Sequence, residues 1–421
     1  MGVGGKFWDL LKPYAKQEGP DFLRNKRVAV DLSFWIVQQE TATANSTSYV
    51  KKPHLRLTFF RTINLFSKFG AYPVFVVDGT PSPLKSQARI ARFFRFSGLE
   101  SSSLPVVEEG FPVERNRAFL KCVQECVELL ELFGMPVLKA NGEAEALCAQ
   151  LNREGFVDAC ITADSDAFLF GAQCVIKSLR PNTKEPFECY HMSDIEGGLG
   201  LKRQHLIAIS LLVGNDHDLS GVQGVGLDTA LRFVRMFGEA EILNSLRIIG
   251  NGGISQLHDE ASVCLKTLDH VFNEVALKPK PSHCTFCGHP GSKREHLSSS
   301  CERCASDGGE GCSKKPEGFK CDCSSCDEIK KNKEQQKFEN WKLKMCDKIE
   351  MAPNFPNPEI TGMYLCNSHG QFTDGDPCLS WGSPDIDMLV DFLAFHRLFE
   401  PSYIRQRMIP VLSTIYLREK A

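Results

Sequence analysis

Seven acidic residues in this 421-residue sequence stand where a parallel sheet would bring them together. Some directly follow predicted strands, two begin a predicted helix, and the last follows another apolar segment. The seven residues are Asp31, Asp78, Glu143, Glu145, Asp164, Asp166 and Asp216. Because the carboxyl ends of parallel strands form the crevice where such sheets bind ligands, we predict one acidic site at that edge.

A cluster of this kind predicts bound divalent cations. Two carboxylates ~4 Å apart repel by about 4 kcal/mol at an effective dielectric constant of ~20. Mg²⁺ and Mn²⁺ bind carboxylate and water oxygens, and two such ions can activate a water and stabilise the leaving oxygen of a phosphodiester. Any one of these acids alone could be a helix cap or turn residue, and a glycosidase needs only two. Seven favour a two-metal site.

A basic segment follows Asp78. Residues 85–95 contain four basic residues and no acidic one, and Lys85 and Arg92 share a face of the predicted helix. This face is suited to a phosphate, although a solvated basic face has the same pattern. The formal net charge is −3, from 49 basic and 52 acidic residues, so any contact with nucleic acid must use such local patches.

Apolar periodicity predicts the elements that position these residues. Strands are expected at 27–31, 72–78, 137–139 and 157–162, and helices at 7–14, 54–69, 115–133, 143–153, 228–237, 385–399 and 402–417. The alternation of strand and helix predicts an α/β fold, with a mostly parallel central sheet flanked by helices.

A glycine-rich hairpin, Gly221-Val-Gln-Gly224-Val-Gly226, precedes the helix expected at 228–237. Its glycines allow backbone N–H groups to approach a phosphate, and a helix N-terminus favours negative charge. The pattern is short, so by itself it is a weak indication of phosphate binding.

Eight of the eighteen cysteines lie between Cys284 and Cys326. The spacing is typical of structural zinc sites. One predicted ligand set is Cys284, Cys287, Cys301 and Cys304, and a second is Cys312, Cys321, Cys323 and Cys326, with His283, His289 and His296 as substitutes. Zinc would order a segment that lacks its own core; the alternative is a disordered, redox-exposed insertion, with order returning near Phe338.

The acidic motifs resemble those of the flap-endonuclease/XPG family of structure-specific 5′ nucleases. The matching segments are Val-Ala-Val-Asp31, Val-Phe-Val-Val-Asp78-Gly-Thr-Pro, Gly142-Glu-Ala-Glu145-Ala, Thr-Ala-Asp164-Ser-Asp166-Ala-Phe and Leu-Leu-Val-Gly-Asn-Asp216. They cover roughly residues 1–240. Within this family the chain most resembles the GEN-type Holliday-junction resolvases, especially plant members, through Met1-Gly-Val-Gly-Gly-Lys-Phe-Trp8 and the segment 140–151.

The resemblance implies a PIN/5′-nuclease-like fold and a DNA endonuclease that uses two Mg²⁺ or Mn²⁺ ions at the seven carboxylates. It implies that Lys85 and Arg92 reach the scissile phosphate and that Gly2 lies near the branch point of the DNA. The hairpin containing Gly224 and Gly226 would belong to a helix–two-turn–helix element that grips the duplex, with a K⁺ ion bound by backbone carbonyls. Such an enzyme reads DNA shape rather than sequence.

Two features favour junction cleavage over replication flaps. The segment from Ser97 to Pro112 is short and rich in helix breakers, which resembles the open arch of junction resolvases, and Gln406-Arg-Met-Ile409 lacks the aromatics of a sliding-clamp box. We expect symmetric paired nicks in four-way junctions, with 5′ flaps also cut, in homologous recombination and DNA repair. The symmetry of the junction predicts a homodimer on DNA, formed from a free monomer.

The sequence is also compatible with other functions. A flap or single-strand-selective endonuclease on the same fold is the nearest alternative, followed by a non-catalytic module that binds branched DNA. A PIN-type ribonuclease is more distant, because the hairpin at 221–226 would have no role.

The expected regions follow from these motifs. They are an XPG N-terminal nuclease region (1–96), an open arch segment (97–114), an XPG internal nuclease region (115–218), a helix–two-turn–helix region (219–280), a cysteine-rich zinc segment (281–335) and a C-terminal helical region (336–421). The chain ends about where GEN-type proteins continue into a chromodomain, so we expect a short or truncated form. His217 stands where family members often have tyrosine, with a small effect expected.

The location of the protein is predicted from absences and from the substrate. The N-terminus has no signal-peptide core, and the longest apolar stretch, near 207–213, is far shorter than the ~20 residues that span a bilayer. We therefore expect an intracellular protein outside the membrane, and a DNA substrate places it in the nucleus.

Overall fold

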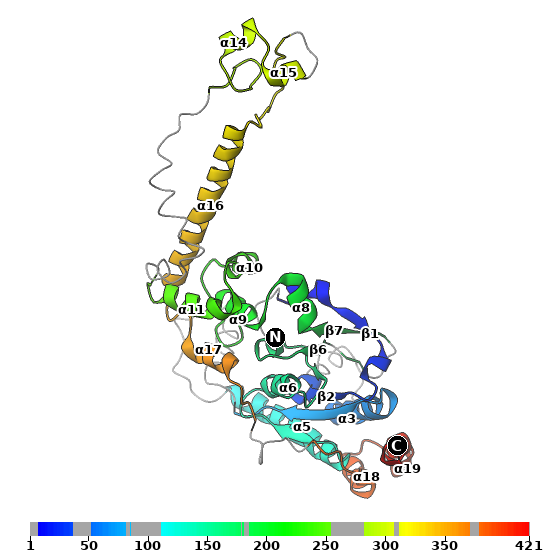
Figure 1. Cartoon of the computed structure of the whole chain (residues 1–421). Helices are drawn as coiled ribbons and strands as arrows, with labels where there is room; N and C mark the ends of the chain where they lie inside the picture. Colours follow the sequence, from blue (N-terminus) through cyan, green and yellow to red (C-terminus); the bar gives the residue numbers. More distant parts are fainter. Residues whose placement is uncertain are drawn as a thin grey trace. The chain divides into compact units, whose positions relative to one another are not determined.

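The computed structural model contains two compact units. It describes residues 7–36, 52–80, 85, 111–177, 179–180, 185–253, 282–306, 311–370 and 379–420. One unit consists of residues 1–246 and 354–421, and the other of residues 247–353 (Figure 1). Gly2, Arg92 and residues 97–110 of the expected arch segment lie outside the described residues.

The first unit is built on a seven-stranded sheet in the order β1-β7-β6-β5-β2-β3-β4. The strands are β1 (Lys16–Glu18), β2 (Arg27–Asp31), β3 (Tyr72–Val77), β4 (Val137–Lys139), β5 (Ala159–Ile161), β6 (Cys174–Lys177) and β7 (Phe187–His191). The five strands from β6 to β4 are parallel, whereas β7 and β1 are antiparallel additions at one edge. The predicted α/β fold with a mostly parallel sheet is confirmed.

Both faces of the central strands are buried. Val28 and Val30 of β2 and Phe75 of β3 face a hydrophobic cluster that includes residues of α3 (Pro53–Ile63) and α5 (Phe111–Leu132). Ala29 and Val74 alternate with them and are also fully buried, on the face where α6 (Ala144–Arg153) packs against β2 and β3. Burial on two faces explains the continuous apolar runs of these strands.

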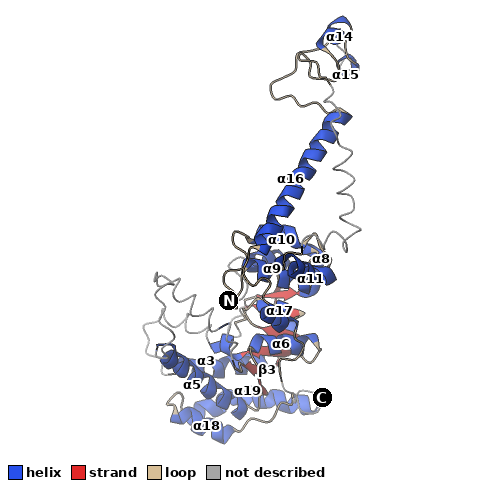
Figure 2. Ribbon diagram, turned by 90° about the vertical axis from the view of Figure 1, so that its left-hand side faces the viewer, coloured by secondary structure: helices blue, strands red, loops and turns tan. Residues whose placement is uncertain are grey.

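The other described helices of the first unit surround the sheet or extend from it, and α11 continues into the second unit. They are α1 (Phe7–Leu11), η1 (Lys12–Tyr14), η2 (Pro20–Leu23), the π-helical turn η3 (Asn64–Lys68), α7 (Asp166–Leu169), α8 (Met192–Leu199), α9 (Arg203–Val213), α10 (Leu227–Val234), α11 (Glu239–Gly250), α17 (Pro358–Leu365), α18 (Ile386–Phe395) and α19 (Pro401–Lys420). The two terminal helices, α18 and α19, pack on each other, with α18 beside α5 (Figure 2). Within the described ranges, no helix is both long and apolar enough to cross a membrane.

The second unit contains α14 (Lys293–Ser298), α15 (Glu302–Ser306) and α16 (Ser324–Glu350). α16 has 27 residues, about 40 Å at ~1.5 Å per residue, and carries α14 and α15 at its N-terminal end (Figure 1). The helix begins well before Phe338, where order was expected to return, so that expectation was wrong. The expected boundary between 335 and 336 falls inside α16.

Candidate active site

The strands of the parallel sheet position four of the predicted acids. β2 ends at Asp31, and Asp78 directly follows β3. β5 leads to Asp164, and Asp166 is the first residue of α7. Because β5, β2 and β3 are neighbouring parallel strands, these carboxylates lie along the same edge of the sheet, as the sequence predicted.

The other three acids come from helix ends. Glu143 is the N-cap residue of α6, and Glu145 lies in its first turn. Asp216 lies in the loop after α9, where Asn215 Oδ1 accepts a hydrogen bond from the backbone N–H of Asp218 at 2.9 Å. This side-chain bond closes a local turn and fixes the loop that carries the last carboxylate.

All seven carboxylates interact electrostatically within one cluster. The interacting pairs include Asp31–Asp78, Asp31–Asp164, Glu145–Glu143, Glu145–Asp164, Asp166–Asp164 and Asp166–Asp216. Six of the seven side chains are buried, with exposed fractions between 1% and 8%, whereas Asp78 is exposed. The structure therefore brings the whole predicted set to one region.

The burial of these acids opposes their ionisation. Desolvation raises the pKa of Asp31 to about 7, and repulsion from Asp78 and Asp164 adds to the effect. Desolvation and like-charge neighbours also raise the pKa values of Glu145 and Asp166 well above the ordinary range. A site with this many hard oxygen donors fits Mg²⁺ or Mn²⁺. The buried Oδ1 of Asp166 has no hydrogen-bond partner among the described residues, which also fits a cation site.

Lys85 supplies a positive charge beside the carboxylates. Its Nζ lies 2.5 Å from Glu143 Oε1 and 3.5 Å from Glu145 Oε1. Burial lowers the pKa of Lys85, but the two glutamates outweigh it and the net change is upward. Burial likewise raises the pKa of Glu143, but hydrogen bonding and attraction from His217 and Lys85 bring it down to about 2. Glu143 and Lys85 therefore form an ion pair.

Hydrogen bonds orient the two acids at the ends of β2 and β3. Asp78 accepts from the Ser33 hydroxyl and from the backbone N–H of Ala144 at 2.9 Å. The Thr162 hydroxyl donates to Asp31 at 3.3 Å. Gly79 permits this arrangement, because a Cβ there would lie 2.1 Å from the carbonyl oxygen of Ala140. The sequence reasoning overlooked these supporting residues.

Tyr364 is a further site residue that the sequence did not reveal. Its hydroxyl donates to Asp166 Oδ2 at 2.9 Å, and its side chain is fully buried. Desolvation and the neighbouring Asp166 raise the pKa of this phenol, so it remains a donor. The ring also lies edge-on to His217 at 6.0 Å, and His217 Nε2 lies 3.6 Å from Glu143 Oε2. His217 is thus part of the site rather than a peripheral difference from the family.

Tyr364→Phe tests whether this phenol positions Asp166. Removing the donor should reduce the cleavage rate ~10–100-fold and raise the half-saturating Mg²⁺ concentration, because a hydrogen-bond partner orients a carboxylate that would bind the ion. Tyr190→Phe is a matched control, since Tyr190 OH donates to Glu188 at 2.9 Å outside the acidic cluster. An unchanged Mg²⁺ dependence in Tyr364→Phe would contradict the positioning role.

The glycine hairpin connects α9 and α10. Gly221 has φ +52°, and a Cβ there would lie 2.5 Å from the Gly214 nitrogen, so the position requires glycine. The backbone N–H of Val222 donates to Leu212 O at 2.9 Å, which ties the hairpin to the end of α9. Gly224 also has a positive φ, and Gly226 is the N-cap of α10. The structure thus places the glycine hairpin directly before a helix, as the sequence predicted for 221–226 and 228–237.

The two aromatic residues at the start of α1 are part of the packing. Phe7 is 1% exposed. Trp8 lies 5.0 Å from the Tyr190 ring, and its indole N–H donates to Ala163 O at 3.1 Å.

The cysteine-rich segment groups its donors differently from the prediction. In the described part of the second unit, three sets of donor atoms lie within 4.8 Å: His283 with Cys321, Cys323 and Cys326; Cys287 with His289, Cys301 and Cys304; and Cys287 with His296, Cys301 and Cys312. Cys312 therefore lies with Cys287 and Cys301, and His283 takes its place beside Cys321, Cys323 and Cys326. Cys284 packs in a buried cluster with Cys287 and Cys304.

Comparison with known families and proteins agrees with this geometry. Residues 1–95 match the XPG N-terminal domain, and residues 134–216 match the XPG I-region. Flap endonuclease GEN-like 1 of Arabidopsis thaliana is 63% identical over 423 residues, which cover 100% of this chain and 69% of that protein. The protein of the same name in Oryza sativa subsp. japonica is 54% identical, with coverage of 100% and 68%.

Solved structures give the same result for the fold. Human GEN1 in complex with Holliday junction DNA matches with a TM-score of 0.64 at 23% identity, over 99% of this chain and 79% of that chain. The catalytic core of Rad2 in complex with a DNA substrate matches with a TM-score of 0.61 at 25% identity, over 97% and 99%. The chain belongs to the GEN flap endonucleases of the XPG family.

Proposed function

We propose that this chain is a metal-dependent endonuclease that recognises branched DNA by its structure. It would resolve four-way junctions by symmetric paired nicks and also cut 5′ flaps. The observation that carries this proposal is the cluster of seven carboxylates, six of them buried, at the carboxyl edge of the sheet, in a chain of the GEN family. The human GEN1 complex with Holliday junction DNA supports the choice of substrate.

The seven carboxylates would hold two Mg²⁺ or Mn²⁺ ions, some of them through water. Bound there, the ions would activate an attacking water and stabilise the leaving oxygen of the phosphodiester. Ser33, Ala144 and Thr162 hold the ligand oxygens of Asp78 and Asp31 in place. This preorganisation means that the carboxylates need little rearrangement when the substrate arrives.

Contacts with DNA would come from several elements. Lys85 is placed beside the carboxylates by Glu143 and Glu145, from where its ammonium would steady the charge that develops on the scissile phosphate. We propose the same role for Arg92, and a position near the branch point for Gly2. The hairpin with Gly224 and Gly226 would hold the duplex backbone, with a K⁺ ion at its carbonyl oxygens.

The regional organisation and assembly form part of the proposal. The proposed regions are the XPG N-terminal region at 1–96, the arch at 97–114, the internal region at 115–218 and the helix–two-turn–helix region at 219–280, followed by the cysteine-rich segment from 281 and a C-terminal helical region, with no boundary inside α16. Two copies would assemble on one junction, because a two-fold symmetric substrate presents two equivalent strands. We propose a nuclear location, because the proposed substrate is DNA.

In the metal-free chain the free energy of unfolding should fall as pH rises, and bound cations should reverse this dependence. The pKa of Asp31 is about 7 in the folded chain, against an ordinary 3.8, so between these values the folded chain keeps a proton that the unfolded chain has lost. The metal-free chain should therefore lose stability as pH rises from about 4 to 7, by a few degrees in Tm. Thermal unfolding in chelator and in Mg²⁺ measures this; a Tm that rises over the same range in chelator would contradict it.

The decisive experiment uses the full chain and two substrates of matched sequence. The chain, with Mg²⁺, is incubated with an immobile four-way junction and with a 5′ flap, beside an Asp31→Ala control. Symmetric paired nicks in the junction, absent from the control, are expected. A flap cut with an untouched junction would favour the flap endonuclease alternative. Binding without any cut would favour a non-catalytic module that binds branched DNA.

A further inference from the structure

The second unit contains a dense set of metal-binding side chains that the active site does not use. Between residues 282 and 326 there are eight cysteines and three histidines. We propose that they bind zinc at two separate centres. The His283 centre consists of His283, Cys321, Cys323 and Cys326; the Cys287 centre draws on Cys284, Cys287, His289, His296, Cys301, Cys304 and Cys312. Zinc binding at these centres is independent of the proposed DNA cleavage.

The His283 centre has the dimensions of a tetrahedral zinc site. Its four donor atoms lie within 4.8 Å of one another, and His283 Nε2 is 3.5 Å from Cys323 Sγ and 3.3 Å from Cys326 Sγ. In a zinc tetrahedron with Zn–S of ~2.3 Å and Zn–N of ~2.0 Å, the S···N edge is about 3.5 Å. A single lone pair on one ring nitrogen cannot accept full hydrogen bonds from two thiols, so a shared ion explains this geometry better.

The Cys287 centre shows the same dimensions. His289 Nδ1 lies 3.5 Å from Cys301 Sγ and 3.3 Å from Cys304 Sγ, and His296 Nδ1 lies 3.2 Å from Cys287 Sγ. The two overlapping donor sets of this centre share Cys287 and Cys301. Its seven donors exceed what one four-coordinate ion needs, so the centre can hold at least one ion.

The backbone around the cysteines is arranged to stabilise thiolates. In each of three Cys-x-x-Cys units, the first Sγ accepts a hydrogen bond from the backbone N–H of the second cysteine; the units are 284–287, 301–304 and 323–326. Such N–H donors favour the charged sulfur that binds metal.

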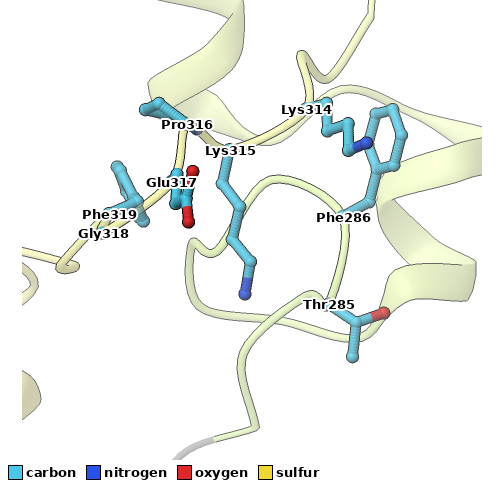
Figure 3. Close-up of a pocket in the computed structure, with 8 residues that line it drawn as sticks. All are labelled: Thr285, Phe286, Lys314, Lys315, Pro316, Glu317, Gly318 and Phe319. Carbon is cyan, nitrogen blue, oxygen red and sulfur yellow. The ribbon is translucent and has the colours of Figure 1, made fainter.

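The turn after the first unit is held against the chain that carries Cys312. Gly288 has φ +81°, and a Cβ there would lie 2.6 Å from the Phe319 ring. The backbone N–H of Lys315 donates to Phe286 O at 2.9 Å. Figure 3 shows residues 314–319 and Thr285 and Phe286 around a pocket of about 540 Å³. This contact brings Cys312 to the other donors.

The segment has no hydrophobic core that could take the place of metal. Among its described residues, the apolar side chains that are buried are all cysteines: Cys284, Cys287, Cys304 and Cys323. Segments of this size without an apolar core usually depend on metal or disulfides, and the cysteines described here are free. Cys323 caps α16, and Cys326 lies in its first turn, so the His283 centre would also fix the start of that helix.

Metal content and two sets of variants test the proposal on the full chain. The zinc-loaded chain should carry at least two zinc ions by native mass spectrometry. His283→Ala should lose one ion and keep the others, and the double variant Cys287→Ser/Cys301→Ser should keep only the ion of the His283 centre. Cys366→Ser, at an exposed cysteine outside the segment, should change nothing. Fewer than two ions in the unaltered chain, or a loss of all zinc in each variant, would overturn two separate centres.

Thiol protection gives a second readout that needs no variant. With zinc present, Cys321, Cys323 and Cys326 should react with an alkylating reagent far more slowly than the exposed Cys366, and a chelator should remove the difference. Equal reaction of these cysteines and Cys366 in the zinc-loaded chain would refute the His283 centre, whether or not the chain cleaves DNA.

Discussion

Asp31→Asn is expected to lower the cleavage rate by at least ~10³-fold while making the metal-free chain more stable. The carboxylate would hold a cation whose contribution to the transition state is several kcal/mol, and the amide is a much weaker ligand. The stability gain follows because Asp31 is buried and repelled by Asp78 and Asp164, which hold its pKa at about 7. At neutral pH and above, the amide removes that repulsion and keeps the shape of the side chain.

Asp158→Asn is a matched control for this experiment. Asp158 is an exposed aspartate beside the opposite end of β2, where it accepts a hydrogen bond from the backbone N–H of Arg27 at 2.7 Å. The same chemical change there should leave cleavage unaltered. Single-turnover cleavage and thermal unfolding in chelator measure the two effects on Asp31→Asn. A variant that was both inactive and less stable in chelator would mean that Asp31 has a structural rather than an electrostatic role.

Lys85→Met should reduce cleavage by ~10²–10³-fold, the usual cost of removing a donor aimed at developing charge. Its second effect should be a loss of stability in chelator, since Glu143 would remain buried with its main cationic partner gone. Mg²⁺ should restore that stability but not the rate. This separation distinguishes a group that acts on the substrate from one that merely neutralises the carboxylates.

The control for Lys85 is a lysine in an exposed ion pair. Lys16 pairs with Asp194 at 2.6 Å, and its side chain is 52% exposed. Pairs of this kind contribute little to stability, so Lys16→Met should change neither rate nor Tm appreciably. If Mg²⁺ returned the cleavage rate of Lys85→Met to normal, the proposed contact with the scissile phosphate would be refuted.

The carboxylate set could be predicted because it depends on local patterns. Each of Asp31 and Asp78 stands next to a run of apolar residues that is recognisable as a buried strand, and parallel strands end at a common edge. Strands β1, β6 and β7 were not predicted, because β1 and β6 have only three and four residues and β7 does not alternate regularly between apolar and polar residues. The same limit applies to the start of α16, whose first 21 residues have no buried side chain and therefore no apolar stripe.

The remaining parts of both sites depend on contacts between distant segments. Tyr364 lies 198 residues from Asp166, in a short helix whose sequence has no unusual feature. His283 lies 40 residues from Cys323. Because the prediction used only the spacing of the cysteines, it placed Cys312 rather than His283 with Cys321, Cys323 and Cys326. Periodicity and spacing report what a residue does within its own element, whereas these pairings are decided by packing between elements.

The path of the chain also has a consequence for partial products of translation. The chain leaves the first unit after residue 246 and returns to it at residue 354. Tyr364, which donates a hydrogen bond to Asp166, is therefore synthesised after the whole second unit. When residues 1–246 have been synthesised, all seven carboxylates of the site are present in the chain but Tyr364 is not. Premature termination between residues 247 and 354 would yield a fragment that has all seven carboxylates of the site. Asp166 in that fragment would lack its hydrogen bond from Tyr364.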